Sequence, residues 1–246
     1  MSAVSVIEIS ALKASYAKRE VLHGLDLSIE QGESFGIIGL NGAGKTTMIK
    51  IILGLKDQDS GNVKITGLER LDPKTRSVIS YLPERFDPPW FLKGEEFIQF
   101  SASLYGRKVH QDEIQELATE LALDTDALKR RVQTYSKGMR QKLGLIATIL
   151  TGCPVLLLDE PMSGLDPLAR ARVRNVLQTL KKKGRTVILS SHILSDMDEI
   201  CDRICVIHGG VMEFQGTPDG FKNVMGEATL ENAFLRVVSK ADEVAA

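Results

Sequence analysis

The chain has 246 residues, of which 43% are apolar and 26% are charged. A chain of this length and composition can bury a core that folds without disulfides or a structural metal, which excludes disordered proteins and small disulfide-rich scaffolds. Its 31 basic and 32 acidic side chains nearly cancel, whereas proteins that hold nucleic acid by electrostatics usually carry a basic excess. We therefore expect no nucleic-acid partner.

The sequence also predicts where the protein works. The first ten residues lack the basic patch and the apolar region of a secretory signal. The longest weakly polar stretch, residues 143–158, is interrupted by polar residues and a proline, and it is shorter than the roughly 20 apolar residues of a spanning helix. Three cysteines are typical of reduced thiols in the cytosol. We expect a cytoplasmic chain; a metal site at Cys201, Cys205 and His208 is the weaker alternative to small buried side chains.

The first predicted elements are strands. Hydrophobic alternation over residues 4–9 and 21–29 predicts two half-buried antiparallel strands, joined by a polar turn at residues 18–20. Residues 34–38 form a short apolar run that leads into a glycine-rich loop, and residues 47–55 predict an apolar helix. The order at this point of the chain is strand, loop, helix.

The rest of the chain alternates helices with buried strands. Continuous aliphatic runs predict a parallel sheet covered on both faces, and they fall at residues 155–158, 186–189 and 204–207. Helical patterns fall at residues 94–105, 111–123, 137–150, 167–183 and 193–201. Residues from about 86 to 150 are therefore predicted to form a helix-rich insertion between strands.

The glycine-rich loop matches the phosphate-loop pattern. The matching residues are Gly39, Leu40, Asn41, Gly42, Ala43, Gly44, Lys45, Thr46 and Thr47. Glycines let backbone amides turn toward phosphate oxygens, and the amino end of the following helix adds positive potential. Lys45 is predicted to reach the β and γ phosphates, and the Thr46 hydroxyl to bind Mg²⁺. The alternative, a flexible connector, is disfavoured by the flanking strand and helix.

Three ionisable residues follow the later strands. Asp159 and Glu160 come directly after residues 155–158, at the strand end where ligands bind in such sheets. Asp159 is predicted to hold Mg²⁺ and Glu160 to orient the water that attacks the γ phosphate. His192 follows the next strand and is predicted to hydrogen-bond the γ phosphate or that water. The alternatives are solvent-facing carboxylates and a capping or surface histidine.

Residues 133–141 read Gln-Thr-Tyr-Ser-Lys-Gly-Met-Arg-Gln, and here the chain resembles the ATP-binding cassette (ABC) family, whose signature is Leu-Ser-Gly-Gly-Gln. The resemblance runs from Val4 to about Gln215, with its parts in the family's order. It implies an α/β fold: a P-loop NTPase core of the ABC ATPase type with a mostly parallel sheet, an N-terminal antiparallel β subdomain and an inserted α-helical subdomain at about 86–150. We expect one domain over residues 1–238 and a C-terminal tail over residues 239–246.

The resemblance implies further ATP contacts. Tyr16 resembles the aromatic residue that stacks on adenine; the alternative is an ordinary strand tyrosine. Two cassettes of this family dimerise head to tail, with each ATP between one phosphate loop and the partner's signature. Ser136 and Gly138 of the signature segment (residues 135–139) are therefore implied to contact the partner's ATP; the alternative role of the segment is a capped start to the helix at residues 137–150. Asp166 of the D-loop (residues 163–166) is implied to face it too, and it also fits a helix cap.

The chain departs from the family pattern within the signature segment and at Glu84. Lys137 and Met139 replace a glycine and the glutamine of the signature, but the serine and the second glycine remain, so we expect binding to survive. Glu84 stands where the family usually has a glutamine that contacts Mg²⁺ or water. A glutamate keeps an oxygen ligand and adds negative charge near phosphate. Glu84 as a third metal ligand and Glu84 as a solvated surface residue both stay open.

Finally, residues 81–84, 135–141 and 230–235 together resemble the ATPase subunits of ABC-2 type exporters. This implies a subunit that binds and hydrolyses ATP and drives a separate transmembrane permease by ATP-dependent dimerisation, as a homodimer or heterodimer, on the cytoplasmic face of the membrane. Aromatic residues at 86–91 belong either to a permease-binding groove or to the subdomain core. The alternative function is a soluble ABC ATPase that acts as a nucleotide-switched assembly scaffold, as in iron–sulfur cluster biogenesis.

Overall fold

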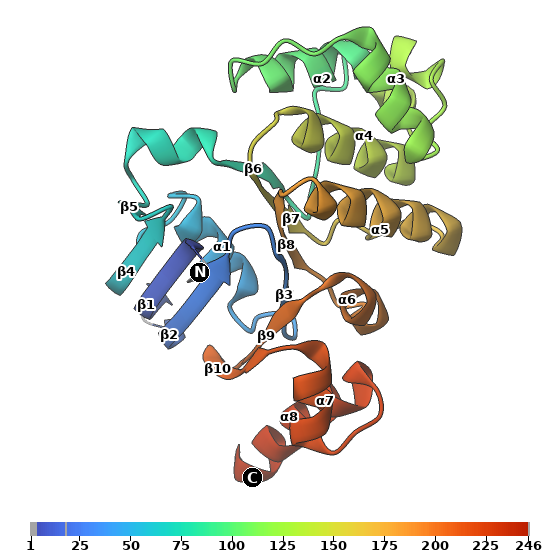
Figure 1. Cartoon of the computed structure of the whole chain (residues 1–246). Coiled ribbons are helices and arrows are strands. Elements are labelled where there is room, and N and C mark those ends of the chain that lie inside the picture. The colour runs from blue at the N-terminus through green and yellow to red at the C-terminus, as the bar shows by residue number, and fades with distance from the viewer. Residues whose placement is uncertain (1–3, 18, 246) are drawn as a thin grey trace. The chain divides into compact units, whose positions relative to one another are not determined.

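The structure, a computed structural model, describes residues 4–17 and 19–245, and side chains as far as residue 239. The chain divides into two compact units (Figure 1). The first consists of Met1–Arg76 and Ile188–Ala246, and the second of Ser77–Val187. The unit boundary falls inside strand β8 (Thr186–Ser190).

An antiparallel sheet opens the first unit. Its strands lie in the order β2 (Arg19–Glu30), β1 (Ser5–Tyr16), β4 (Ser60–Ile65) and β5 (Leu68–Glu69). The predicted antiparallel pair is confirmed, with Ile9 opposite Leu27. Both strands are longer than predicted, because register shifts such as the one between Ile9 and Leu12 break the alternation on which the prediction relied. Lys18, in the predicted turn, lies outside the described residues.

The first unit also contains buried parallel strands. β3 (Ser34–Ile38) pairs in parallel with β9 (Arg203–His208), and β10 (Val211–Gly216) pairs antiparallel with β9. All five residues of β3 are buried, as its continuous apolar run predicts. The helices of this unit are α1 (Lys45–Ile52), α6 (Leu194–Ile200), α7 (Pro218–Met225) and α8 (Leu230–Ala245). Helix α8 continues past residue 238, where the sequence analysis ended the domain and began a C-terminal tail. That boundary stays a prediction.

In the second unit, β6 (Ile79–Leu82) pairs in parallel with β7 (Val155–Asp159). The chain forms three α-helices after β6 and before β7. These are α2 (Gly94–Ser103), α3 (Gln111–Glu120) and α4 (Lys137–Leu150), with α5 (Pro167–Lys182) following β7. Short 3₁₀ helices occupy Pro73–Ser77, which crosses the unit boundary, Ala127–Lys129 and Val132–Thr134. The α/β class, with an antiparallel sheet, mostly parallel strand pairs and a helical insertion, is confirmed.

Glycine explains how closely α4 packs on its neighbours. A Cβ atom on Gly144 would lie 2.7 Å from Leu82 Cδ1 and 2.9 Å from Phe86 Cδ1. Phe86 also meets Phe97 edge to face, with ring centroids 5.6 Å apart. Phe86 therefore packs against α4 and α2 as a half-buried side chain, whereas Trp90 and Phe91 are 63% and 57% exposed.

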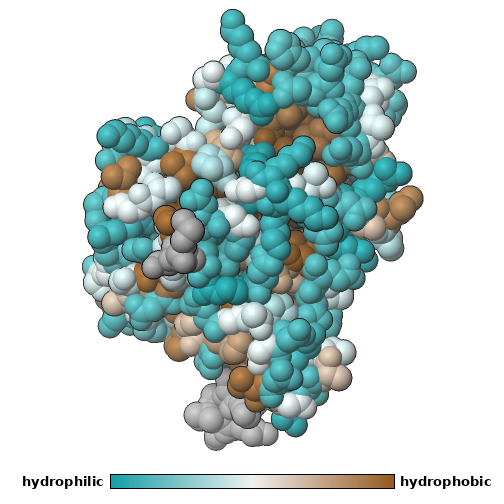
Figure 2. Space-filling view, viewed as in Figure 1, coloured by the Kyte–Doolittle hydropathy of each residue, from teal (hydrophilic) through white to brown (hydrophobic). Residues whose placement is uncertain are grey.

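Surface hydropathy agrees with the composition. The face shown in Figure 2 is largely hydrophilic, with separate hydrophobic patches. Among residues 4–17 and 19–245, no helix has both the length and the apolar character needed to cross a membrane.

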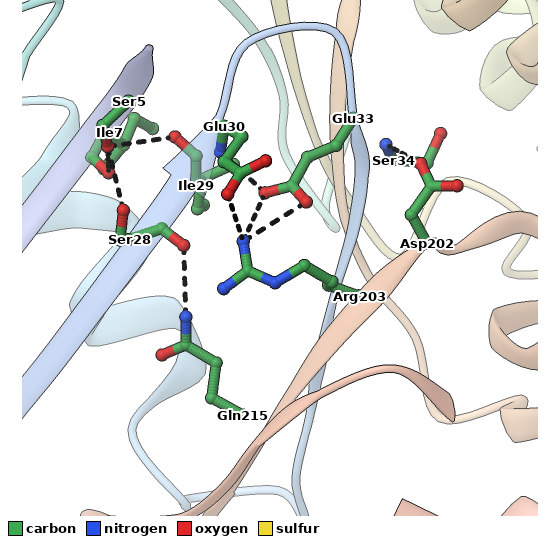
Figure 3. A network of polar contacts seen from close by, with 10 residues as sticks. All are labelled: Ser5, Ile7, Ser28, Ile29, Glu30, Glu33, Ser34, Asp202, Arg203 and Gln215. Atoms are coloured by element: carbon green, nitrogen blue, oxygen red, sulfur yellow. Dashed lines mark hydrogen bonds and ion pairs between the residues drawn. The ribbon is translucent and has the colours of Figure 1, made fainter. Parts of the chain in front are cut away.

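A polar network anchors the start of β3 in the first unit (Figure 3). Arg203 Nη1 lies 3.2 Å from Glu33 Oε1 and 3.9 Å from Glu30 Oε1. The Asp202 carboxylate accepts a hydrogen bond from the Ser34 amide at 2.9 Å. Glu33 is 8% exposed, and its burial raises its pKa despite the hydrogen bonds it accepts from the Glu30 amide and Arg203. The network therefore buries a carboxylate just before the strand that leads to the phosphate loop.

Glu33 gives the fold a measurable pH dependence. Because its pKa is raised on folding, the folded chain binds this proton more tightly than the unfolded chain does. The stability that protonated Glu33 contributes is fully present below the ordinary glutamate pKa of 4.5. It is lost as the pH rises through the pKa of Glu33 in the folded chain. Glu33→Gln cannot titrate, so the fall in unfolding free energy above pH 4.5 should be shallower than in the wild type. Urea titrations at several pH values measure this, and identical slopes in the two proteins contradict it.

Candidate functional site

The phosphate loop joins β3 to α1 in the first unit, and its glycines are required by its shape. Gly42 and Gly44 have φ angles of 84° and 109°, in the left-handed region that favours glycine. A Cβ on Gly39 would lie 2.5 Å from the Ile207 carbonyl oxygen, and one on Gly44 would lie 2.5 Å from Leu22 Cδ2. At Gly39 and Gly44 the backbone therefore approaches its neighbours more closely than a residue with a side chain allows.

The start of α1 suits a bound anion. The helix begins at Lys45 after the N-cap residue Gly44, which has no side chain with which to cap the first amides. Lys45 Nζ donates hydrogen bonds to the carbonyl oxygens of Gly39 at 2.6 Å and Leu40 at 3.1 Å, so the ammonium group folds over the loop. Thr46, on the first turn, is exposed. Amides, an ammonium group and a hydroxyl at one bend fit a phosphate group.

Tyr16 and His192 also belong to the first unit. Tyr16 ends β1 and is 48% exposed, with Lys56 Nζ 4.5 Å from its ring centroid. His192 is exposed between β8 and α6, where the preceding Ser191 accepts the Ile193 amide at 3.0 Å. Both predicted residues therefore have accessible side chains, as contact with a ligand requires.

The two predicted carboxylates end β7 in the second unit. Asp159 is 2% exposed and Glu160 is 9% exposed. Glu160 has a φ angle of 51°, a left-handed conformation that costs a residue with a side chain about 1–3 kcal/mol. Gln141 Nε2 donates to the carbonyl oxygens of Glu160 at 3.3 Å and Pro161 at 3.1 Å. Sequence reasoning missed Gln141, which lies two residues beyond the signature segment.

Tyr81 is a second neighbour that sequence reasoning missed. It pairs with Leu157 across β6 and β7, so its side chain lies on the same face as Asp159. Its hydroxyl donates a hydrogen bond to Asp159. Burial, together with the negative charges of Asp159 and the exposed Glu84, raises the pKa of Tyr81. The negative charge of Glu84 therefore lies close enough to Tyr81 to raise the pKa of that tyrosine.

The signature segment and the D-loop meet within the second unit. Ser136 caps α4 by accepting the Met139 amide at 3.2 Å, and Asp166 caps α5 by accepting the Ala169 amide at 2.8 Å, a bond that lowers the pKa of Asp166. A Cβ on Gly138 would lie 3.6 Å from the Gly164 carbonyl oxygen. The helix caps that the sequence analysis weighed as alternative roles are thus present.

The predicted site residues are divided between the two units. The phosphate loop, Tyr16 and His192 belong to the first unit, and the remaining predicted residues belong to the second: Glu84, Ser136, Gly138, Asp159, Glu160 and Asp166. Within the part of the chain that the structure describes, no three His, Cys, Asp or Glu side chains gather as metal ligands. The alternative of a metal site at Cys201, Cys205 and His208 therefore gains no support.

Comparisons with known proteins agree on one family. Residues 22–163, more than half of the chain, match the family described as ABC transporter. The chain is 36% identical to an uncharacterised ABC transporter ATP-binding protein of Synechocystis sp., over 92% of this chain and 68% of the relative. It is 33% identical to a lantibiotic transport ATP-binding protein of Streptococcus pyogenes, over 89% of this chain and 94% of the relative.

A solved structure gives the same result. The fold is similar to that of an ATP-binding subunit of an ABC transporter, with a TM-score of 0.83 and 31% identity over 95% of this chain and 99% of the other. Coverage of relatives varies, and the chain spans 60% of the length of another similar ATP-binding protein.

The contact between Gly39 and Ile207 predicts a steric test of the phosphate loop. Gly39→Ala would place a Cβ 2.5 Å from a backbone oxygen, and the resulting shift should cost roughly 1–3 kcal/mol, or about fivefold to 150-fold in ATP affinity. Gly67→Ala is the control, because its Cβ meets open space among the described residues although φ is 78°. Calorimetric titration with ATP measures both, and equal affinities contradict the expected geometry.

Proposed function

This chain belongs to the ABC transporter family, whose ATP-binding domain it carries, and we propose that it is the ATP-hydrolysing subunit of an ABC-2 type exporter. The observation that supports this most directly is the phosphate loop, where glycine conformations, helix amides and the Lys45 ammonium group converge on one bend. A relative that shares 33% of its residues is named as a lantibiotic transport ATP-binding protein, which favours export.

ATP is held through its base and its phosphates. Tyr16 stacks on the adenine with its exposed ring, and residues 39–47 donate amide hydrogen bonds to the phosphates. Lys45 exchanges its carbonyl partners for β and γ phosphate oxygens. Thr46 and Asp159 are the proposed Mg²⁺ ligands, with Glu84 as a further oxygen donor; the ion, when bound, neutralises phosphate charge.

Hydrolysis depends on positioning. Glu160 orients and polarises the water for in-line attack on the γ phosphate, and His192 donates a hydrogen bond to the γ phosphate oxygens. The bond between the attacking oxygen and phosphorus forms while the bond to the β-phosphate oxygen breaks, which gives ADP and phosphate. The rate gain comes from fixed dipoles and charges around the phosphoryl group rather than from a covalent intermediate.

A second subunit completes each site. Ser136, Gly138 and Asp166 contact the ATP held by the partner's phosphate loop, so two chains close around two nucleotides and separate after hydrolysis. Capping of α4 by Ser136 keeps its hydroxyl at a helix amino end, which favours contact with phosphate, and capping of α5 fixes the Asp166 side chain at the amino end of that helix. The partner is a second copy or a close homologue.

The dimer works beneath a separate transmembrane permease, at the cytoplasmic face of the membrane. The exposed rings of Trp90 and Phe91, which meet edge to face with centroids 5.7 Å apart, are the aromatic residues available to a permease helix. Phe86 is half-buried and packs against Gly144, so less of its ring is available.

Removing the charge of Glu160 separates binding from hydrolysis. Glu160→Gln keeps the shape of the side chain but no longer polarises water, so turnover should fall on the order of 100-fold or more while ATP still binds. The variant should then form an ATP-dependent dimer on size-exclusion chromatography. Lys45→Ala is the matched control: it should lose both ATP binding and the dimer. Undiminished hydrolysis by Glu160→Gln contradicts the assigned role.

Replacing Glu84 tests its role near the metal. Glu84→Gln restores the side chain usual in the family and removes one negative charge near the phosphates. We expect a change in the Mg²⁺ concentration that gives half-maximal ATPase activity, measured by titrating Mg²⁺ at fixed ATP. The exposed Glu116 on α3 provides a control, since Glu116→Gln should leave the Mg²⁺ dependence unchanged. If Glu84→Gln changes neither activity nor Mg²⁺ dependence, Glu84 is a surface residue.

A further inference from the structure

The backbone at Glu160 is strained in two ways. Its φ of 51° is left-handed, which side chains other than glycine rarely adopt. It also precedes Pro161, and residues before proline favour extended conformations with φ near −120°. Relaxation to that value would rotate the chain by roughly 170° about the N–Cα bond and swing the carboxylate away from its present direction. Something must hold the Glu160 turn (residues 160–163) in place.

Hydrogen bonds from one side chain meet this requirement. Gln141, 5% exposed on α4, donates from its single amide nitrogen to the carbonyl oxygens of both Glu160 and Pro161, at 3.3 and 3.1 Å. The Ser163 amide donates to the same Glu160 oxygen at 3.1 Å from within the turn. The contacts from Gln141 are buried, so water cannot easily replace them; losing the donor would remove one hydrogen bond from each of the two carbonyl groups, although the Glu160 oxygen keeps the bond from Ser163.

The same residue links this turn to the signature segment. Gln141 lies five residues after Ser136 on the helix that Ser136 caps, a rise of about 7.5 Å. Figure 1 shows α4 and β7 within the second unit. Gly164 of the D-loop, directly after the turn, lies against the signature segment, because a Cβ on Gly164 would be 3.0 Å from Lys137 Cε. The helix that begins in the signature segment therefore contacts the Glu160 turn through Gln141, and the residue after the turn through Lys137.

We propose that Gln141 is the positioning residue that holds the Glu160 turn in its left-handed conformation and so aims the Glu160 carboxylate, tying it to the helix that carries the signature segment. The proposal rests on the proposed function, because it assumes that Glu160 polarises the attacking water. Gln141 itself touches backbone carbonyl groups and acts on the reaction only through Glu160. Within each subunit, Gln141 thus links the signature segment, which contacts the ATP bound by the partner, to Glu160, which acts on the ATP bound by the same subunit.

Gln141→Leu tests this, because leucine fills a similar volume but donates no hydrogen bond. Misaiming of Glu160 should lower kcat on the order of 100-fold, while KM for ATP stays close to the wild-type value. In the Glu160→Gln background, adding Gln141→Leu should lower the residual turnover no further, because its effect passes through the missing carboxylate. The ATP-dependent dimer of the double variant should form as readily as that of Glu160→Gln alone.

Thr148→Val is the matched control: it removes a buried hydroxyl from the same helix, two turns away, and should hydrolyse ATP like the wild type. If Gln141→Leu does not fold, Gln141→Asn carries the test, since its shorter amide should still lower kcat about tenfold.

Wild-type kcat in a folded Gln141 variant, or loss of the ATP-dependent dimer in the double variant, overturns the proposal. If the wild type itself neither binds nor hydrolyses ATP, it is the proposed function that fails.

Discussion

Positive potential at one bend of the backbone is the constraint on which the rest of the structure depends. Lys45 is 7% exposed, and burying its ammonium group costs free energy unless oxygen atoms surround it. The carbonyl groups of Gly39 and Leu40 accept hydrogen bonds from this group. In the proposed function, phosphate oxygens take the place of these carbonyl groups. The buried strand β3 leads into the bend, and Gly42 and Gly44 give it its left-handed turns.

The remaining site residues are divided between the two units. The first carries the groups proposed to bind nucleotide, and the second carries the carboxylates, the signature segment and the D-loop. In the second unit these three elements pack on one another through Gln141, Gly138 and Lys137. In the proposed mechanism, catalysis by Glu160 depends on main-chain geometry, because a strained turn aims its side chain and Gln141 of a neighbouring helix holds the turn.

The sequence predicted the features that depend on local rules. The phosphate loop, the helix caps at Ser136 and Asp166 and the α/β class follow from residue spacing, and the structure contains each. Strand length in β1 was underestimated because a register shift near Leu12 breaks the alternation. Gln141 and Tyr81 were missed because their partners are 20 and 78 residues away in the chain. Hydrogen bonds to a distant carbonyl, or between adjacent strands, leave no periodic pattern in a single sequence.

A crystal structure of the chain with Mg²⁺ and a nonhydrolysable ATP analogue tests the central claim most directly. The account predicts two copies around two nucleotides, each triphosphate lying between residues 39–47 of one copy and Ser136 and Gly138 of the other. A nucleotide bound away from residues 39–47, or one enclosed by a single copy with the signature segment facing solvent, would contradict it.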